Sequence, residues 1–272
     1  MGGVKTCRMY DLLHEFCLAK AKDENFLLLI RGHDKFLDFD EPDNLHRLCI
    51  HCQPKHFMKS RLFCSRIRSI LFFSCGPRSH KILNNLSFIY HLKLLRVLDL
   101  DQISLGINFP SEIVILVQLR YLAILGGVKD IPSLIGNLSN LETFLVTMDY
   151  YGFGKFLLPD SLLIMQRLRH LHVRGALIDL SLAKDSSSTY NLYTFSTPKL
   201  YLGKRMENMM RKFPNICNLK CSLLESEEFS GDSKKIVAMY FLSQLESLKL
   251  LLGNVTGHHL EFRLPLNLKS SQ

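Results

Sequence analysis

Histidine and cysteine residues near the N-terminus have a spacing that could bind a metal ion. His46, Cys49, Cys52 and His56 read as His-x-x-Cys-x-x-Cys-x-x-x-His, and thiolates and imidazoles are common Zn²⁺ ligands. The same segment has the alternation of a β-strand, on which successive side chains point to opposite faces. Cys52 would share the inner face with Leu48, whereas Cys49 would point the other way. We therefore predict no metal site here.

Catalytic and nucleotide-binding motifs are not found in the sequence. No Ser/His/Asp or Cys/His grouping has a recognisable spacing, and Gly152-Phe-Gly154 is followed by no third glycine. There is also no G-x-x-x-x-G-K-[ST] loop, the motif that holds the phosphates of a bound nucleotide. We predict that the chain is not an enzyme and that it does not hold ADP or ATP by itself.

The net charge and the apolar runs of the sequence limit the kinds of partner and the cellular location that we expect. The 272 residues carry a formal charge of +9, which favours acidic partners. No groove-reading motif accompanies this charge, so we do not expect nucleic-acid binding. No apolar run approaches the ~18 residues of a transmembrane segment, and the first residues do not resemble a secretory signal. We expect a cytoplasmic protein, with peripheral membrane association or a nuclear pool as alternatives.

A leucine-rich repeat dominates the chain from about residue 61 to its end. The pattern L-x-x-L-x-x-L-x-L begins at Leu92, Leu116, Leu138, Met165, Phe213 and Leu242, with a degenerate copy around Leu192 and Phe195 and weaker copies at Cys64 and Leu45. Successive full copies start 22 residues apart at Leu116 and Leu138, and 29 apart at Phe213 and Leu242. This is the period of leucine-rich repeats. We predict a curved parallel β-sheet whose repeats share one core.

Proline-containing spacers separate the predicted strands. Phe109-Pro110, Ile131-Pro132 and Leu158-Pro159 each precede apolar residues at intervals of about three. Because proline fixes φ and lacks an N–H, it suits the first position of a short helix or turn. We predict such helices or turns on the convex side of an α/β solenoid. The asparagine that commonly follows the strand of a leucine-rich repeat is absent, since Ile103 stands there.

Alternation along the strands predicts the partner-binding surface. In RVLDL, Leu98 and Leu100 point inward and Asp99 points outward. The equivalent outward positions form the concave face, on which we expect contact with a partner. The candidate binding residues are Asp99, Asp101, Tyr121, His170, His172, Arg174, Lys220 and Lys249. The concave face would change from acidic and apolar to basic along the solenoid.

The opening stretch carries a family resemblance. VKTCRMYDLLHEFC at residues 4–17 resembles the end of the nucleotide-binding module of plant intracellular immune receptors, the NB-ARC leucine-rich-repeat family. In that family a Met-His-Asp motif opens a helix of a winged-helix subdomain just before the repeats. The matching residues here are Met9, Tyr10 and Asp11. The strands LLRVLDL and LRYL are similar to the coiled-coil class, in particular to the late blight resistance proteins of nightshade plants.

The resemblance implies a division of the chain and a role for it. Residues 1–30 would be a remnant of the winged-helix subdomain, residues 31–60 a linker with a first irregular repeat, and residues 61–272 the repeats. Met9, Tyr10 and Asp11 would be the remnant of a nucleotide-sensing motif, with ADP or ATP bound only in the full-length family. Tyr10 departs from the family's histidine, and the phosphate-binding loop is absent. We therefore expect a truncated receptor or a fragment of its gene.

The implied function is plant defence through protein binding. The partner would be a pathogen effector, a guarded host protein or the receptor's own nucleotide-binding domain. Two other functions remain open on the residues alone: an extracellular leucine-rich-repeat receptor or inhibitor, and an F-box-type ubiquitin-ligase adaptor. The first would need a signal peptide and paired cysteines, and the second an N-terminal recruitment motif. Neither set of features is visible in the sequence.

Overall fold

A computed structural model of the chain describes most of the repeats and the helix that precedes them. The described residues are 10–31, 45–51, 65–73, 86–128, 130–148, 155–175, 177–179, 189–224, 235–253, 260–266 and 268. Among the residues singled out in the sequence, Met9, Cys52, His56, Cys64, Gly152 and Gly154 lie outside these ranges.

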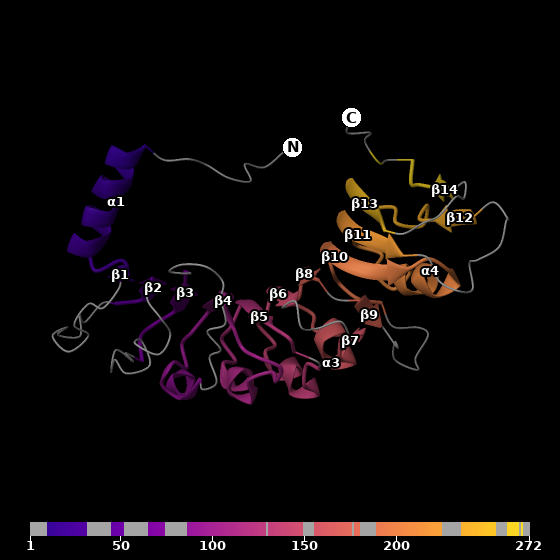
Figure 1. Cartoon of the computed structure of the whole chain (residues 1–272). Coiled ribbons are helices and arrows are strands. Elements are labelled where there is room, and N and C mark those ends of the chain that lie inside the picture. Colours follow the sequence, from indigo (N-terminus) through magenta and orange to yellow (C-terminus); the bar gives the residue numbers. More distant parts are fainter. Residues whose placement is uncertain are drawn as a thin grey trace.

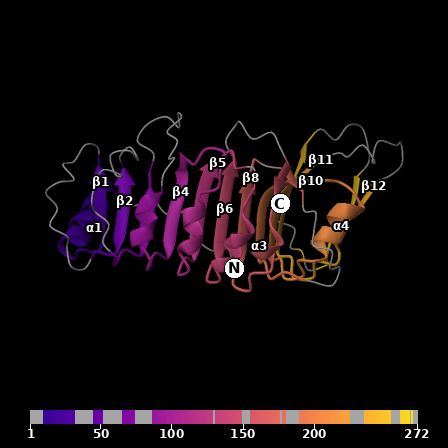
Figure 2. The ribbon, with the colours of Figure 1, turned by 90° about the horizontal axis from the view of Figure 1, so that it is seen from below.

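One parallel β-sheet runs through the molecule in sequence order, as predicted. Its main path is β1-β2-β3-β4-β5-β6-β8-β10-β11-β13, and every pairing is parallel. Figure 2 shows these strands side by side, and Figure 1 shows that they follow an arc and form its inner side. The strands are β1 (Leu28–Arg31), β2 (Arg47–His51), β3 (Ser69–Phe72), β4 (Val97–Ser104), β5 (Tyr121–Gly126), β6 (Thr143–Met148), β8 (His170–Arg174), β10 (Thr194–Tyr201), β11 (Asn218–Leu224) and β13 (Ser247–Gly253).

Four further strands complete the sheets among the described residues. β7 (Lys155–Leu157) pairs with β9 (Leu177–Asp179), which in turn pairs with β10. β12 (Lys235–Ala238) and β14 (Leu260–Arg263) form a separate two-stranded parallel sheet. Both pairs lie in segments that interrupt the regular repeat.

Leucines of the repeat stack in register to make the core. Leu98, Leu122 and Leu171 occupy the same place on β4, β5 and β8, and each is 0% exposed. The degenerate copy is also confirmed, because Phe195 pairs with Leu171 and both Leu192 and Phe195 are buried. One unit could not bury its apolar side alone, but stacked units share a continuous core. The register inferred from the leucine spacing is therefore correct.

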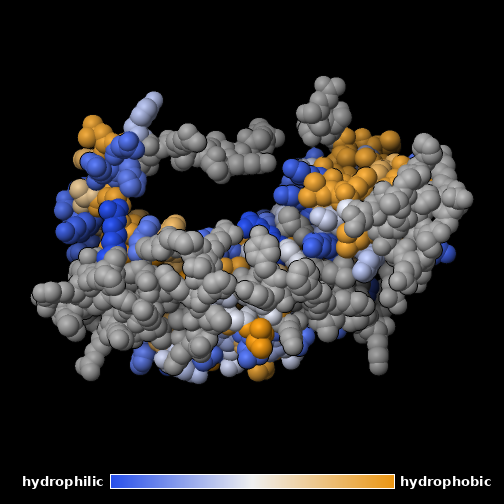
Figure 3. Space-filling view, in the orientation of Figure 1, coloured by the Kyte–Doolittle hydropathy of each residue, from blue (hydrophilic) through white to orange (hydrophobic). Residues whose placement is uncertain are grey.

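The last strand departs from the prediction. Leu248 occupies the same row as Leu219 and should be buried by analogy, yet it is only half-buried, as is Leu250. Among the described strands β13 pairs with β11 alone, so within this part of the chain no further strand pairs with the other edge of β13. Leu251 and Leu252 are 47% and 54% exposed. Figure 3 shows the resulting gathering of apolar atoms at this end of the arc.

Short helices cover the convex side, where the proline spacers predicted them. Pro110, Pro132 and Pro159 stand at the N-caps of η2 (Ser111–Ile115), η3 (Ser133–Asn137) and α3 (Asp160–Leu163), with φ of −69°, −65° and −71°. These φ values are close to those that the proline ring imposes. Two further segments, η1 (Ser87–His91) and α4 (Lys204–Met210), lie on the same side of the sheet (Figure 1).

An exposed helix precedes the sheet. α1 (Asp11–Asp23) begins with an acidic residue and carries Lys20 and Lys22 in its last turn, as suits the helix dipole. None of its residues is buried, and Leu12 and Phe16 are 81% and 65% exposed. The sheet begins at Leu28, and the division of the chain at residue 30 stays a prediction. No helix among the described residues is long and apolar enough to cross a membrane.

Candidate protein-interaction surface

The concave face is built from outward positions that stay in register across the sheet. We call the middle line of these positions the central row. It consists of Leu29, Cys49, Leu71, Asp99, Ala123, Leu145, His172, Ser196, Lys220 and Lys249. Along the central row the side chains are apolar at the first strands, acidic at β4, apolar again at β5 and β6, and basic at β11 and β13. The predicted residues Asp99, His172, Lys220 and Lys249 thus form one line.

A polar cluster lies beside Asp99 on the same face. The Asp101 carboxylate accepts a hydrogen bond from Thr147 Oγ1 at 2.5 Å and pairs with Arg174 Nη1 at 3.7 Å. The backbone N–H of Asp101 donates to Asp99 Oδ1 at 3.0 Å. Because β4, β6 and β8 each supply one partner, the stacking of repeats assembles this cluster from residues far apart in the sequence.

Burial shifts the protonation equilibria in this part of the face. It raises the pKa of Asp99, with a smaller contribution from the Asp101 charge, while the hydrogen bond from the Asp101 N–H opposes the rise. Burial also raises the pKa of Tyr121, and the carboxylates of Asp99 and Asp101 add to it. A desolvated carboxylate interacts more strongly with an approaching cation than a hydrated one does. These groups are thus suited to polar recognition.

Two histidines lie on β8 with their rings on the concave face. His170 Nδ1 is 3.1 Å from Thr194 Oγ1. Burial lowers the pKa of His170, as does nearby Arg169. Burial also lowers the pKa of His172, helped by the charges of His170 and Arg174. Both rings are therefore neutral at pH 7 and can both donate and accept hydrogen bonds.

The alternation along β5 misjudged two exposures, and the prediction missed one partner. Leu125 is an outward position but is only 7% exposed. Ala123 points outward, as the alternation predicts, but it is fully buried between Asp99 and Leu145 in the central row. Thr147 is absent from the predicted residues, although it contacts Asp101. The alternation in Leu145-Val146-Thr147 places Thr147 outward and could have revealed it.

The other candidates from the sequence are dispersed over α1, β2 and the residue that precedes β2. Tyr10 is 86% exposed, and Asp11 begins α1. His46 Nδ1 contacts the backbone oxygen of Arg66 at 3.1 Å. Cys49 lies in the central row between buried Leu48 and Ile50, which matches the expected alternation. Among the described residues no group of three or more His, Cys, Asp or Glu is placed to hold a metal ion.

Polar side chains form hydrogen bonds between neighbouring repeats. Asn140 Nδ2 donates to the Val117 oxygen at 2.9 Å, and Arg167 Nη1 donates to Asn140 Oδ1 at 3.0 Å. Asn215 Nδ2 donates to Asn191 Oδ1 at 3.1 Å. These side chains stand just before the second leucine-type residue of each repeat, whereas Ile103, at the usual asparagine position, is buried. The cross-links were therefore missed because they occupy a different place in the repeat.

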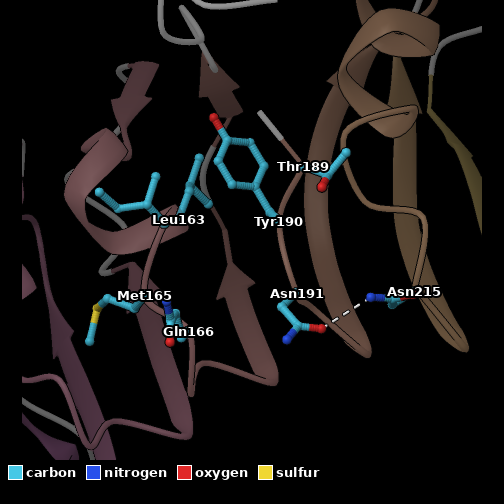
Figure 4. A pocket seen from close by; sticks show the side chains of 8 residues that line it. Leu163, Met165, Gln166, Thr189, Tyr190, Asn191 and Asn215 are labelled. Carbon is cyan, nitrogen blue, oxygen red and sulfur yellow. Dashed lines mark hydrogen bonds between the residues drawn. The ribbon is translucent and has the colours of Figure 1, made fainter. Parts of the chain in front are cut away.

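A small hollow opens where the irregular repeat meets its neighbours. It has a volume of about 330 Å³ and is lined by Leu163, Ile164, Met165, Gln166, Thr189, Tyr190, Asn191 and Asn215. Figure 4 shows the bonded pair Asn191 and Asn215 on one side. Burial raises the pKa of Tyr190, so its phenol stays neutral. Among the described residues, the lining includes no carboxylate, histidine or cysteine.

Comparison with known proteins relates the chain to a group of plant resistance proteins. The putative late blight resistance protein homolog R1B-8 of Solanum demissum is 32% identical over 258 residues, which are 92% of this chain and 21% of the relative. Homolog R1B-23 of the same plant is 31% identical over 265 residues, 93% of this chain and 20% of the relative. The chain is a homologue of the late blight resistance proteins. It corresponds to their leucine-rich-repeat region and spans about a fifth of the length of these two relatives.

Two solved structures align with this late blight resistance homologue at low similarity. One is an internalin of Listeria monocytogenes, 13% identical with a TM-score of 0.45, covering 78% of this chain and 64% of the other. The second is the leucine-rich-repeat ectodomain of the receptor kinase GASSHO1/SCHENGEN3 of Arabidopsis thaliana, 16% identical with a TM-score of 0.45, covering 83% and 27%. No protein-family model matches the sequence.

The lowered histidine pKa values predict that mild acid destabilises this homologue. A histidine whose pKa is lower in the folded state than its unfolded value of about 6.5 binds fewer protons when folded. The free energy of unfolding therefore falls as pH drops below about 6.5, toward the folded pKa. The contribution of His172 arises from its burial and from His170 and Arg174. The raised pKa of Asp99 acts in the opposite direction, but only in more acidic solution.

Urea unfolding at pH 7.5, 6.5 and 5.5 tests this prediction. The wild-type chain should lose stability across the range, and His172→Gln should flatten the loss. His14→Gln, on exposed α1, is the matched control and should retain the wild-type dependence. An unchanged slope in His172→Gln would mean that the ring is not desolvated as the structure shows.

Proposed function

We propose that the chain is the partner-binding repeat module of an intracellular plant resistance receptor and acts in plant defence. Its concave face would bind a protein, in the first instance a pathogen effector. A guarded host protein or the receptor's own nucleotide-binding domain would be the other occupants. Under this proposal the chain is cytoplasmic, residues 1–30 belong to the end of the nucleotide-binding module, and Met9, Tyr10 and Asp11 sense a nucleotide only in a longer receptor.

The observation that carries the proposal is the basic pair on the last two strands of the central row. Lys220 and Lys249 are direct neighbours in the central row, and His172 lies two strands before Lys220. On the other half of the face, Asp101 and Arg174 neutralise one another. The central-row residues of β10, β11 and β13 include two lysines and no carboxylate, so this half favours an acidic partner surface. Homology to the resistance proteins supports defence as the setting.

Charge reversal on the concave face tests the proposal. The triple variant Arg174→Glu, Lys220→Glu and Lys249→Glu should bind an effector or nucleotide-binding domain at least tenfold more weakly in low salt. Its affinity should also depend less on salt, because exposed charges act mainly through screened attraction. Binding is measured by calorimetry at low and high salt.

Two further variants serve as controls for this experiment. Arg174→Glu also breaks the contact with Asp101, so the double variant Lys220→Glu and Lys249→Glu is measured alongside. The triple variant Lys20→Glu, Lys93→Glu and Lys204→Glu changes the same charge at sites outside the central row, and it should bind like wild type. Equal affinity and salt dependence in all three variants would place recognition away from the concave face.

A further inference from the structure

Three arginines lie side by side at the rim of the concave face. Arg68, Arg96 and Arg120 each stand immediately before a strand: β3, β4 and β5. Their backbones are bonded in series, since the Arg96 N–H donates to the Arg68 oxygen at 2.7 Å and the Arg120 N–H donates to the Arg96 oxygen at 2.8 Å. We call these three residues the arginine rim. All three are exposed.

The spacing of the arginine rim is unfavourable for the isolated chain. Adjacent strands lie about 4.8 Å apart, so neighbouring residues of one row are close. Like charges directly opposite each other on neighbouring strands destabilise a sheet. The positive charge of Arg120 is balanced by Glu142, whose Oε1 lies 3.5 Å from Arg120 Nη1. Arg68 and Arg96 have no acidic partner among the described residues. Two of the three guanidinium groups therefore lack a counter-charge within that part of the chain.

The residue that follows the arginine rim on the next strand indicates which chemical group of a partner would bind these arginines. Glu142 follows Arg120 one strand further on, where its N–H donates to the Arg120 oxygen at 2.8 Å. Its carboxylate already pairs with Arg120 across that single strand spacing. Carboxylates also match the planar fork of a guanidinium. A partner that places carboxylates at similar intervals would satisfy Arg68 and Arg96 in the same way.

The interval between arginines also favours one secondary structure in the partner. On a helix, residues four apart lie about 5–6 Å from each other, close to the strand spacing of about 4.8 Å. On an extended strand, residues on one face are about 6.6 Å apart, which fits less well. We infer that the arginine rim binds an acidic helix of the protein partner, with carboxylates at i, i+4 and i+8. This inference rests on the proposed function, because it assumes a protein partner beside the concave face.

A designed peptide can test the inference before the natural partner is identified. The probe is an alanine-rich peptide of about 20 residues with glutamates four residues apart. This length exceeds the roughly 15 residues below which an isolated helix is only marginally stable in water. A second peptide has the same composition, with the glutamates spread around the helix. The wild-type chain should bind the aligned peptide at least tenfold more tightly than the spread peptide in fluorescence anisotropy at low salt.

Substitutions locate the binding on the rim. Arg68→Gln with Arg96→Gln should weaken aligned-peptide binding about tenfold or more, because charge-assisted pairs are lost. Lys20→Gln with Lys204→Gln makes the same charge change at sites off the rim and should leave binding unchanged. Glu142→Gln releases Arg120 and should strengthen binding severalfold. Urea unfolding of the rim variant should show equal or greater stability than wild type, which excludes misfolding as the cause.

Several outcomes would overturn the inference. These are equal binding of the aligned and spread peptides, no binding of either, or equal losses in the rim and control variants. Tighter rim-dependent binding of polyuridine RNA or of phosphatidylserine vesicles would assign the rim to nucleic acid or membrane instead. The concave variant Lys220→Glu with Lys249→Glu should still bind the aligned peptide. Its behaviour therefore separates a failure of the rim from a failure of the proposed concave site.

Discussion

Leu122→Ala should lower the free energy of unfolding by about 2–5 kcal/mol, the range for leucine-to-alanine changes in a protein core. Leu122 is 0% exposed on β5, between Leu98 of β4 and Phe144 of β6 in one stacked row. Truncation would remove apolar contacts with both neighbouring repeats and leave a cavity that flanking backbone hydrogen bonds prevent from closing. Urea denaturation followed by circular dichroism measures the change.

Leu248→Ala is the matched control for this effect. Leu248 occupies the same row on β13 but is only half-buried, so less apolar surface returns to water when it is truncated. We expect a loss less than half that of Leu122→Ala. If the two variants lost equal stability, the burial difference between the middle and the end of the sheet would be wrong. If Leu122→Ala lost none, the repeat register itself would be wrong.

The sequence predicted the repeat architecture because one periodic constraint governs it. Each leucine position must meet the same position of the next repeat, so the spacing fixes strand, register and inward face together. The prolines before η2, η3 and α3 added the convex helices by an independent rule, their fixed φ. Even the degenerate copy at Phe195 could be found, because its neighbours determined where it had to stack.

Contacts between different repeats could not be predicted in the same way. The contact of Thr147 with Asp101 joins residues that lie far apart in the chain, and the leucine period says nothing about which polar side chains meet. The asparagine cross-links occupy a new place in the repeat. The half-burial of Leu248 depends on whether another repeat stacks on β13, which its own sequence does not encode. The arginine rim appears only when three strands are set in register.

Gly126→Ala should destabilise the chain by about 1–3 kcal/mol, the usual cost of forcing extra volume into a packed region. Gly126 ends β5, and a Cβ placed on it would lie 2.7 Å from the backbone oxygen of Gly106. That oxygen is held in place, because Gly106 has φ of 74° and the Leu105 N–H donates to the Leu125 oxygen at 2.8 Å. A backbone atom cannot rotate away as a side chain could, so the two strands must separate.

Gly127→Ala is the control, since it adds the same methyl group one residue later. A Cβ at Gly127 would meet the Ile107 side chain at 3.6 Å, an ordinary contact. We therefore expect the free energy of unfolding to change by no more than about 0.5 kcal/mol, or to rise slightly, as for glycine-to-alanine changes that cause no strain.

In Gly126→Ala, separation of β4 and β5 should also disturb Asp101, which lies where the pairing of the two strands shifts register. Gly126→Ala should thus weaken partner binding on the concave face as well as stability, measured by urea unfolding and calorimetry on both variants. Equal stability of the two variants would contradict the close approach of β4 and β5 and, with it, the position of Asp101 beside Arg174.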